Sequence, residues 1–447
     1  MKRAGFDTIP DRPHYWLADA RTPACLVDSD KVGEPDFEGL VRLDIEVRDG
    51  SIASLAPTGS APAVSTNLRG GMVWPGFVDI HTHLDKGHIW PRSPNPEGSF
   101  SGAAGSTAKD RAAHWTAEDV RARMEFGLAC AFAQGTVAVR THLDSPAPQA
   151  EISWPVFRAV RDAWAGRIDL QAASIMPMDF FAQPQGDRLA DIVAESGGML
   201  GCVTRASTGI HDALPPEFRD LLERIFRLAM DRGLDLDLHV DESGDGGARA
   251  LIEIARMSTR LGFQGRIQCG HCCSLAVQED AFVTETLTAV SDAGICIVSL
   301  PMVNMYLQGR DTGRTPRWRG VTLLHELKAE GVEVSIASDN CRDPFHAYGD
   351  HDMLEVMTQA TRIAHLDHPF GDWPTAFTAV PAKVMGLGNR GRLKVGDPAD
   401  LVLLSARFMS EMMSRSQADR IVLRQGRAID TSLPDYRQLD PLLGLDA

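Results

Sequence analysis

The sequence contains no run of about 20 apolar residues, the length that a helix needs to cross a bilayer. It also has no long basic stretch, and its net charge of −15 argues against nucleic acid or an anionic membrane as a main partner. The first residues lead directly into polar sequence, without the apolar segment of a signal peptide. These absences favour a globular protein of the cytoplasm that acts on a small molecule.

Cysteine is also scarce, with 8 residues in a chain of 447. They are scattered apart from one adjacent pair, Cys272-Cys273, which suits reduced thiols better than a disulfide framework. No Cys-x-x-Cys motif occurs, so a thiolate zinc site has no support from the sequence. The zinc deaminases that act on nucleic acid need such a motif together with His-x-Glu, and the sequence excludes that class.

The central part of the chain alternates strand-like and helical patterns. Apolar, strand-like runs occur at residues 78–84, 136–143, 168–176, 201–206, 234–240, 266–272, 294–300 and 332–338. The clearest helical patterns lie at residues 117–133, 216–232, 248–261, 323–330 and 352–364. This alternation predicts an α/β fold, a (β/α)8 TIM barrel over residues 74–385. The rival, a doubly wound sheet, would carry a Gly-x-Gly-x-x-Gly fingerprint after its first strand, and none is present.

Both flanks of this central part consist of short strand-like runs and turns. Residues 1–73 hold such runs from about Cys25 onward, and residues 386–447 hold them near 400–404 and 420–427. We therefore predict a small β-sandwich that is built from both ends of the chain.

The most informative motif is His81-Thr82-His83, which follows a β-branched apolar run. Side chains two apart on a strand point to the same face, so His81 and His83 can direct two imidazoles at one point. Imidazole is a common ligand of zinc and similar divalent metals. Alone the motif is weak, because two polar residues at the end of a strand also have ordinary explanations.

Further polar residues stand where other predicted strands end, which in a TIM barrel is where the active site forms. They are Asp85, His142, Asp144, His239, Asp241, Glu242, His271, Asp339 and Asn340. Taken singly, His142 and His271 have structural explanations as hydrogen-bonding residues. One subset supplies three imidazoles and a carboxylate, enough to hold one divalent metal with room for water: His81, His83, His239 and Asp339.

The segments that carry these residues resemble the amidohydrolase superfamily, and within it the cytosine deaminase branch. They are Pro75–Asp85, Arg140–Asp144, Asp237–Glu242, Pro301–Arg310 and Gly391–Leu401. The resemblance spans nearly the whole chain after about residue 25. It implies a TIM barrel of the metal-dependent hydrolase type and an enzyme that uses a metal to hydrolyse C–N bonds in cyclic amidines.

The resemblance also implies roles for the site residues. Glu242 would move protons to and from the ring, Asp339 would take the proton of the attacking water, and His271 would orient that water. The end of the fourth predicted strand has no lysine that could hold a second metal, so one zinc or iron ion is expected. Its ligands would be His81, His83, His239 and Asp339.

Four residues are predicted to contact the substrate. Asn304 and Gln308 follow the seventh predicted strand, in a segment, Pro301–Arg319, that we expect to be a loop in the pocket wall. Met178 stands where this branch usually carries a glutamine that reads the pyrimidine amide. Asn340 stands where cytosine deaminase has an aspartate. These differences from the branch at Met178 and Asn340 leave the identity of the substrate open.

Three functions are therefore weighed. The first is deamination of a cytosine-like pyrimidine or related cyclic amidine, with release of ammonia. The second is release of an alkylamine from an N-alkyl triazine, or action on a pterin or purine. The third is a non-catalytic barrel homologue, which the complete ligand set and Glu242 disfavour. Relatives are commonly homo-oligomers, so self-association is possible, although the sequence shows no interface signal.

Overall fold

The computed structural model describes residues 8–205, 214–417 and 419–445. Residues 1–7 and 446–447 of the predicted β-sandwich, and Ala206 of the fourth predicted strand, lie outside the described residues. The chain divides into two compact units. The first comprises Met1–Asp79, Ala129–Ala138 and His351–Pro434, and the second comprises Ile80–Leu128, Val139–Asp350 and Asp435–Ala447.

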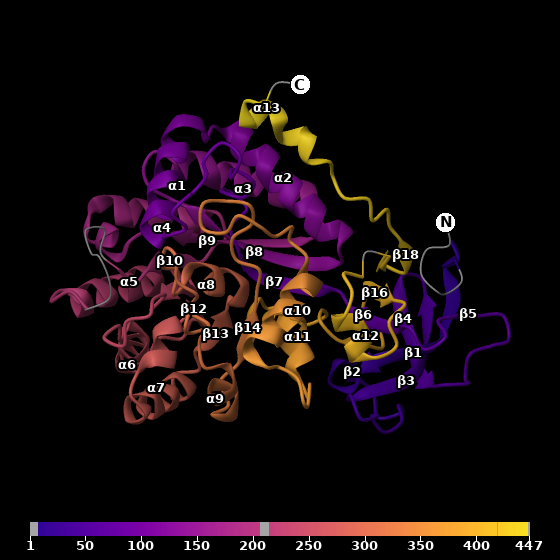
Figure 1. The fold of residues 1–447 in the computed structure, drawn as a ribbon. Coiled ribbons are helices and arrows are strands. Elements are labelled where there is room, and N and C mark those ends of the chain that lie inside the picture. The colour runs from indigo at the N-terminus through magenta and orange to yellow at the C-terminus, as the bar shows by residue number, and fades with distance from the viewer. Residues whose placement is uncertain (1–7, 206–213, 418, 446–447) are drawn as a thin grey trace. The chain divides into compact units, whose positions relative to one another are not determined.

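The first unit is built on an eight-stranded sheet to which both ends of the chain contribute (Figure 1). The strand order is β18-β17-β16-β6-β1-β3-β4, with β5 beside β1. β6 and β16 pair antiparallel, with Val73 opposite Leu403, and both residues are fully buried in the core. The strands are β1 (His14–Pro23), β3 (Leu40–Arg48), β4 (Ser51–Pro57), β5 (Thr66–Asn67), β6 (Met72–Pro75), β16 (Leu401–Leu404), β17 (Ile421–Arg424) and β18 (Arg427–Ala428).

Shorter elements complete the first unit. A two-stranded sheet pairs β2 (Val27–Asp28) with β15 (Leu393–Lys394). The helices are η1 (Ala24–Leu26), α10 (Met353–Ala364), η4 (Trp373–Phe377), α11 (Ala379–Val384) and α12 (Met409–Met413). Where a β-sandwich ends and a barrel begins along the chain stays a prediction.

The strands of the second unit, and those that lead into it, form two sheets. One contains β7 (Phe77–Thr82), β8 (Thr136–Asp144) and β9 (Asp169–Ile175). The other contains β10 (Leu200–Val203), β11 (Leu236–Val240), β12 (Ile267–His271), β13 (Cys296–Ser299) and β14 (Val334–Ile336), all parallel to their neighbours.

Isolated bridges link these two sheets at both edges. Ala173 pairs with Met199 between β9 and β10, and Thr82 at the end of β7 pairs with Asp339 beyond β14. The ladders themselves do not close into one continuous barrel, yet the strands follow one another in chain order as they do in a TIM barrel. The fold is TIM-barrel-like, and its carboxyl strand ends carry the residues of the predicted site.

Helices follow most of these strands, and α4 to α7 lie outside β10 to β13 (Figure 1). They are α1 (Phe100–His114), α2 (Ala117–Ala133), α3 (Ala150–Trp164), η2 (Met178–Ala182), α4 (Pro184–Glu195), α5 (Phe218–Arg232), α6 (Ala250–Leu261), η3 (Cys273–Val277), α7 (Asp280–Asp292), α8 (Pro301–Leu307) and α9 (Leu324–Ala329). None of the helices in the described parts of the chain is both long enough and apolar enough to cross a membrane.

One segment differs from the prediction. Pro301–Arg319 was expected to be a loop, but its first part forms the helix α8, with Pro301 at the first position. Proline is favoured there because its fixed φ suits a helix, and because a backbone N–H at the first position would have no partner within the helix. Asn304 therefore lies on a helix, and Gln308 is its C-cap.

The last part of the chain returns to the second unit as a C-terminal segment, Asp435–Gly444, which holds η5 (Tyr436–Leu439) and α13 (Asp440–Leu443). Arg92 donates a hydrogen bond to the carbonyl oxygen of Leu442 at 2.8 Å. The Tyr436 ring lies 5.6 Å from that of Phe126 and 6.1 Å from that of His88, between ring centroids. The segment thus packs against helix α2 and the loop that follows β7.

Candidate metal centre and catalytic site

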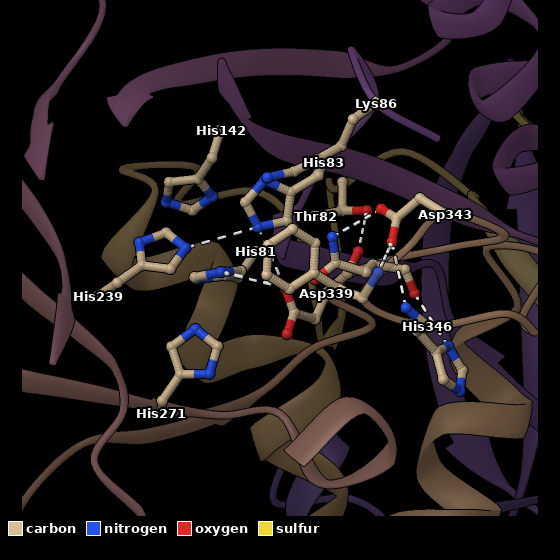
Figure 2. Close-up of polar contacts among 12 residues, drawn as sticks. His81, Thr82, His83, Lys86, His142, His239, His271, Asp339, Asp343 and His346 are labelled. Carbon is tan, nitrogen blue, oxygen red and sulfur yellow. Dashed lines mark hydrogen bonds and ion pairs between the residues drawn. The ribbon is translucent and has the colours of Figure 1, made fainter. Parts of the chain in front are cut away.

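Four imidazoles converge at the carboxyl ends of β7, β8 and β11 (Figure 2). They belong to His81, His83, His142 and His239, and their ring centroids lie between 4.0 and 5.5 Å apart. The Nε2 atoms of His83 and His239 are separated by 3.5 Å. Each of the four offers one nitrogen within 4.8 Å of the others.

Asp339 brings a carboxylate to the same place. Its Oδ1 atom lies 3.2 Å from His83 Nε2 and 3.6 Å from His81 Nε2. Its backbone N–H donates to the carbonyl oxygen of His81 at 2.8 Å, which fixes the carboxylate beside β7. Both Asp339 and His271 have positive φ, 62° and 70°, a backbone strain that is typical of functional sites. The structure thus brings together the four side chains predicted as metal ligands.

The chemistry of this set fits a divalent metal. Both ring nitrogens of His81 and the Nδ1 atom of His239 are buried without a hydrogen bond. Leaving such atoms unsatisfied is costly, and a cation bound beside Asp339 would satisfy the Nε2 atom of His81. Burial lowers the pKa of His81, His83 and His239 well below the usual range, which keeps the imidazoles in the neutral form that ligates metal. Nitrogen and carboxylate ligands together suit zinc or iron.

A second array lies beside the imidazoles and contains Glu242, His271, Asn304 and Gln308. The Asn304 side-chain amide donates to His271 Nδ1 at 3.0 Å and lies 3.5 Å from Glu242 Oε1. Glu242 Oε1 is 3.4 Å from His271 Nδ1. Gln308 donates to the backbone carbonyl oxygen of Glu242 at 3.3 Å.

This array determines the state of His271. Because the Asn304 amide donates to Nδ1, that nitrogen is an acceptor and the proton sits on Nε2. His271 Nε2 is buried without a hydrogen bond, and His271 forms a possible ligand group with His81 and Asp339. His271 can therefore donate a hydrogen bond towards the point where the imidazoles converge, and Glu242 stands next to it as a carboxylate that can carry a proton.

The other two predicted substrate contacts are placed differently. Asn340 donates its side-chain amide to Asp343 Oδ2 at 2.7 Å, so its side chain has a partner within the protein. Met178 is fully buried at the start of η2, and its backbone N–H donates to the carbonyl oxygen of Arg205 at 3.0 Å.

A buried polar layer under the imidazoles was missed by the sequence reading. Asp237 accepts hydrogen bonds from His142 Nε2 at 3.0 Å, from Arg140 at 3.0 Å and from Gln268 at 2.9 Å. These bonds hold the His142 ring and leave its Nδ1 atom facing the other imidazoles. The signal was available, because Arg140 and Asp237 are charged residues inside otherwise apolar strands.

A second missed group surrounds the loop after β7. Lys86 is buried with its Nζ atom 3.2 Å from Asp144 Oδ1, and Arg111 donates to the other oxygen of Asp144 at 2.7 Å. Asp85 accepts a hydrogen bond from the backbone N–H of Asp144 at 2.7 Å. Burial, together with the charge of Asp144, raises the pKa of Asp85 to about 7. These contacts tie the end of β8 to the loop that carries His83.

Comparison with known proteins places this site in a family. The protein-family model described as "Amidohydrolase family" matches residues 66–150 and 189–429 of this chain. A pterin deaminase of Rhizobium rhizogenes (strain K84) is 51% identical over 445 residues, which cover 98% of this chain and 99% of that protein.

Solved structures agree on the fold. 5-Methylcytosine deaminase from Klebsiella pneumoniae, liganded with 5-fluorocytosine, matches with a TM-score of 0.77 at 24% identity, over 93% of this chain and 97% of that chain. N-isopropylammelide isopropylaminohydrolase from Burkholderia multivorans matches with a TM-score of 0.75 at 23% identity, over 95% of this chain and 100% of that chain. The family match, the 51% identical relative and the converging ligands lead to one conclusion. The chain belongs to the amidohydrolase family and is a hydrolase that acts on C–N bonds in cyclic amidines.

Proposed function

We propose that the protein deaminates a pterin, converting a 2-amino-4-oxopteridine and water into the 2,4-dioxopteridine and ammonia. The observation that carries this proposal is the 51% identity to a pterin deaminase over 98% of the chain. The geometry is compatible with it, because a proton-carrying glutamate and a hydrogen-bond-donating histidine stand beside a set of metal ligands.

The residues that would hold the metal, zinc or iron, are His81, His83, His239 and Asp339. When bound, such a metal lowers the pKa of water from about 15.7 to about 7, so that hydroxide is available at neutral pH. Placement of the carboxylate next to His81 and His83 suits Asp339 to accept a proton from the attacking water.

The proton balance then falls to Glu242 and His271. The water oxygen forms a bond to C2 of the ring, and the electron pair of the C2=N bond moves to the ring nitrogen, which Glu242 protonates. When the hydroxyl oxygen on C2 forms the C2=O bond, its proton passes to Glu242, the bond from C2 to the amino group breaks, and ammonia leaves with that proton. The proton that Asp339 took from the water then restores Glu242 to its starting state. His271 donates a hydrogen bond to the oxygen that becomes the new carbonyl.

Cytosine is a weaker candidate substrate, although it was the first expectation from the motifs. The structural neighbour that is a 5-methylcytosine deaminase is 24% identical to this chain, and it supports only the fold. Met178 is fully buried where the branch has its amide side chain, and a thioether offers no hydrogen-bond donor. Leaving a polar edge of the substrate unpaired costs roughly 1–3 kcal/mol.

Release of ammonia from a set of heterocycles tests the proposal. Purified, metal-loaded protein is assayed on pterin, cytosine and N-isopropylammelide, and both ammonia and the ring product are quantified. We expect the highest kcat/KM with pterin and equal amounts of ammonia and 2,4-dioxopteridine. A clearly higher kcat/KM with cytosine, or release of isopropylamine as the main activity, would contradict the proposal.

A further inference from the structure

Arg205 lies at the edge of the catalytic array, just beyond the end of β10. Its Nη2 atom donates to the backbone carbonyl oxygen of Glu242 at 2.6 Å. Its guanidinium carbon lies 4.6 Å from the centroid of the Phe100 ring. Two different elements, the segment after β11 and the start of α1, therefore fix the guanidinium in place.

Arg205 also adjoins the position where the substrate-reading amide is missing. Its carbonyl oxygen accepts the backbone N–H of Met178 at 3.0 Å, so the two residues are held together by their main chains. Met178 has no donor to offer, whereas a guanidinium has five N–H groups in a planar fork. Arg205 thus offers the hydrogen-bond donors that the Met178 side chain lacks.

The guanidinium is close enough to act on the reacting centre. Glu242, whose carbonyl oxygen it contacts, also accepts from Gln308 and lies 3.4 Å from His271. A substrate ring that touches Glu242 and His271 is therefore within reach of Arg205.

Pterins present an edge that matches this donor. The 4-oxo oxygen and ring nitrogen N5 are neighbouring acceptors on the fused bicycle, in the same relation as O6 and N7 of guanine. Arginine recognises that guanine pair with two parallel hydrogen bonds. Cytosine and the triazines are single rings and have no such pair across a ring fusion.

An aromatic wall accompanies the guanidinium. The Phe100 ring lies 5.4 Å from that of Phe345, edge to face, and Lys86 lies 5.0 Å above Phe345. Phe100 and Phe345 are only partly buried. Arginine stacked on a ring keeps its N–H fork in one plane, which preorganises it for a planar ligand.

We propose that Arg205 is the residue that selects a fused bicyclic substrate, by donating two hydrogen bonds to its 4-oxo oxygen and N5. This inference rests on the proposed pterin deaminase function and assigns the residue that reads the second ring. Arg205 touches the substrate away from the bond that breaks, so it determines specificity and takes no proton.

The test compares Arg205→Lys and Arg205→Met with the unchanged protein on pterin and on 5-deazapterin, in which a C–H replaces N5. Arg219→Lys is the matched control, since Arg219 is an exposed arginine on α5 paired with Glu253. Metal content and melting temperature are measured for each protein. A second readout, independent of turnover, is the Kd of the 2,4-dioxopteridine product, which keeps both acceptors.

We expect the Arg205 variants to lose about 10- to 100-fold in kcat/KM on pterin and to bind the product more weakly by a similar factor. On 5-deazapterin the loss should be clearly smaller, because one of the two bonds is already absent. An equal loss on both substrates, or unchanged product binding, would overturn the role of Arg205 while leaving pterin deamination intact. An unchanged protein that does not deaminate pterin would instead overturn the proposed function, and this inference with it.

Discussion

At the scale of single residues, Glu242 gives the sharpest test of the mechanism. Glu242→Gln keeps the shape and the contacts with Asn304 and His271 but removes the ability to carry a proton. A general acid–base group typically contributes roughly 100- to 10,000-fold, so we expect kcat to fall by that factor. Steady-state ammonia release measures the change, and elemental analysis should show the metal content unchanged.

Glu326→Gln is the control for this substitution, because Glu326 is an exposed carboxylate in the first turn of α9. It should leave kcat within experimental error. Turnover of the Glu242 variant close to that of the unchanged protein would show that another group carries the proton.

The residue scale also shows how far the sequence could predict the site. The positions of His81, His83, His239 and Asp339 could be predicted because strand ends in this fold point to one place. The hydrogen-bond partner of Asn340 could not be predicted, because its bond to Asp343 depends on the path of the loop after β14. The same limit hid Arg205, whose contacts lie on the segment after β11 and on the first residue of α1.

At the scale of elements, the C-terminal segment supports the loops that carry the predicted metal ligands. Arg342, in the loop after Asp339, places its guanidinium carbon 4.3 Å from the centroid of the Tyr436 ring. The backbone N–H of His88 donates to the carbonyl oxygen of Cys341 at 3.1 Å, which joins this loop to the one after His83. Tyr436 thus packs against both loops that follow the predicted ligands, the one after His83 and the one after Asp339.

We therefore expect Tyr436→Ala to loosen the metal site. Aromatic contacts contribute about 0.5–1.5 kcal/mol, so metal retention and kcat should fall by roughly 2- to 10-fold. Metal content after dialysis and the rate of ammonia release measure the effect. Leu445→Ala, an exposed residue just beyond the segment, is the control. Equal metal retention in both variants would mean that the segment does not support the site.

Elements differed in how well the sequence predicted them. The helix at Ala117–Ala133 has the bounds expected from its periodicity, and α10 begins one residue late because Asp352 serves as its N-cap and accepts from the N–H of Leu354. Helix α8 was missed because its few residues are too short to show a helical period. The role of the C-terminal segment was missed because packing between distant parts of the chain leaves no local pattern.

At the scale of the whole molecule, metal binding should couple to stability. The buried Nε2 atom of His81 lacks a hydrogen bond without a cation, and a ligand at 100 times its Kd stabilises the folded state by about 2.7 kcal/mol. We expect a chelator such as dipicolinate to abolish ammonia release and to lower the melting temperature, and added zinc or iron(II) to restore both. Calorimetry with metal analysis measures the two effects.

His239→Ala provides the comparison for metal removal. It should bind much less metal, and its melting temperature should respond little to the chelator. His325→Ala, an exposed histidine on α9, should behave like the unchanged protein. If His239→Ala retained as much metal as the unchanged protein, the ligand assignment would be wrong.

The pairing of β6 with β16 has a consequence for how the protein is made. Val73 finds its partner Leu403 only after most of the polypeptide has left the ribosome. Until then one edge of β6 is an unpaired, apolar strand, the kind of surface that associates with other nascent chains. Protection by chaperones during synthesis therefore matters more for this sheet than for a fold whose neighbouring strands are consecutive.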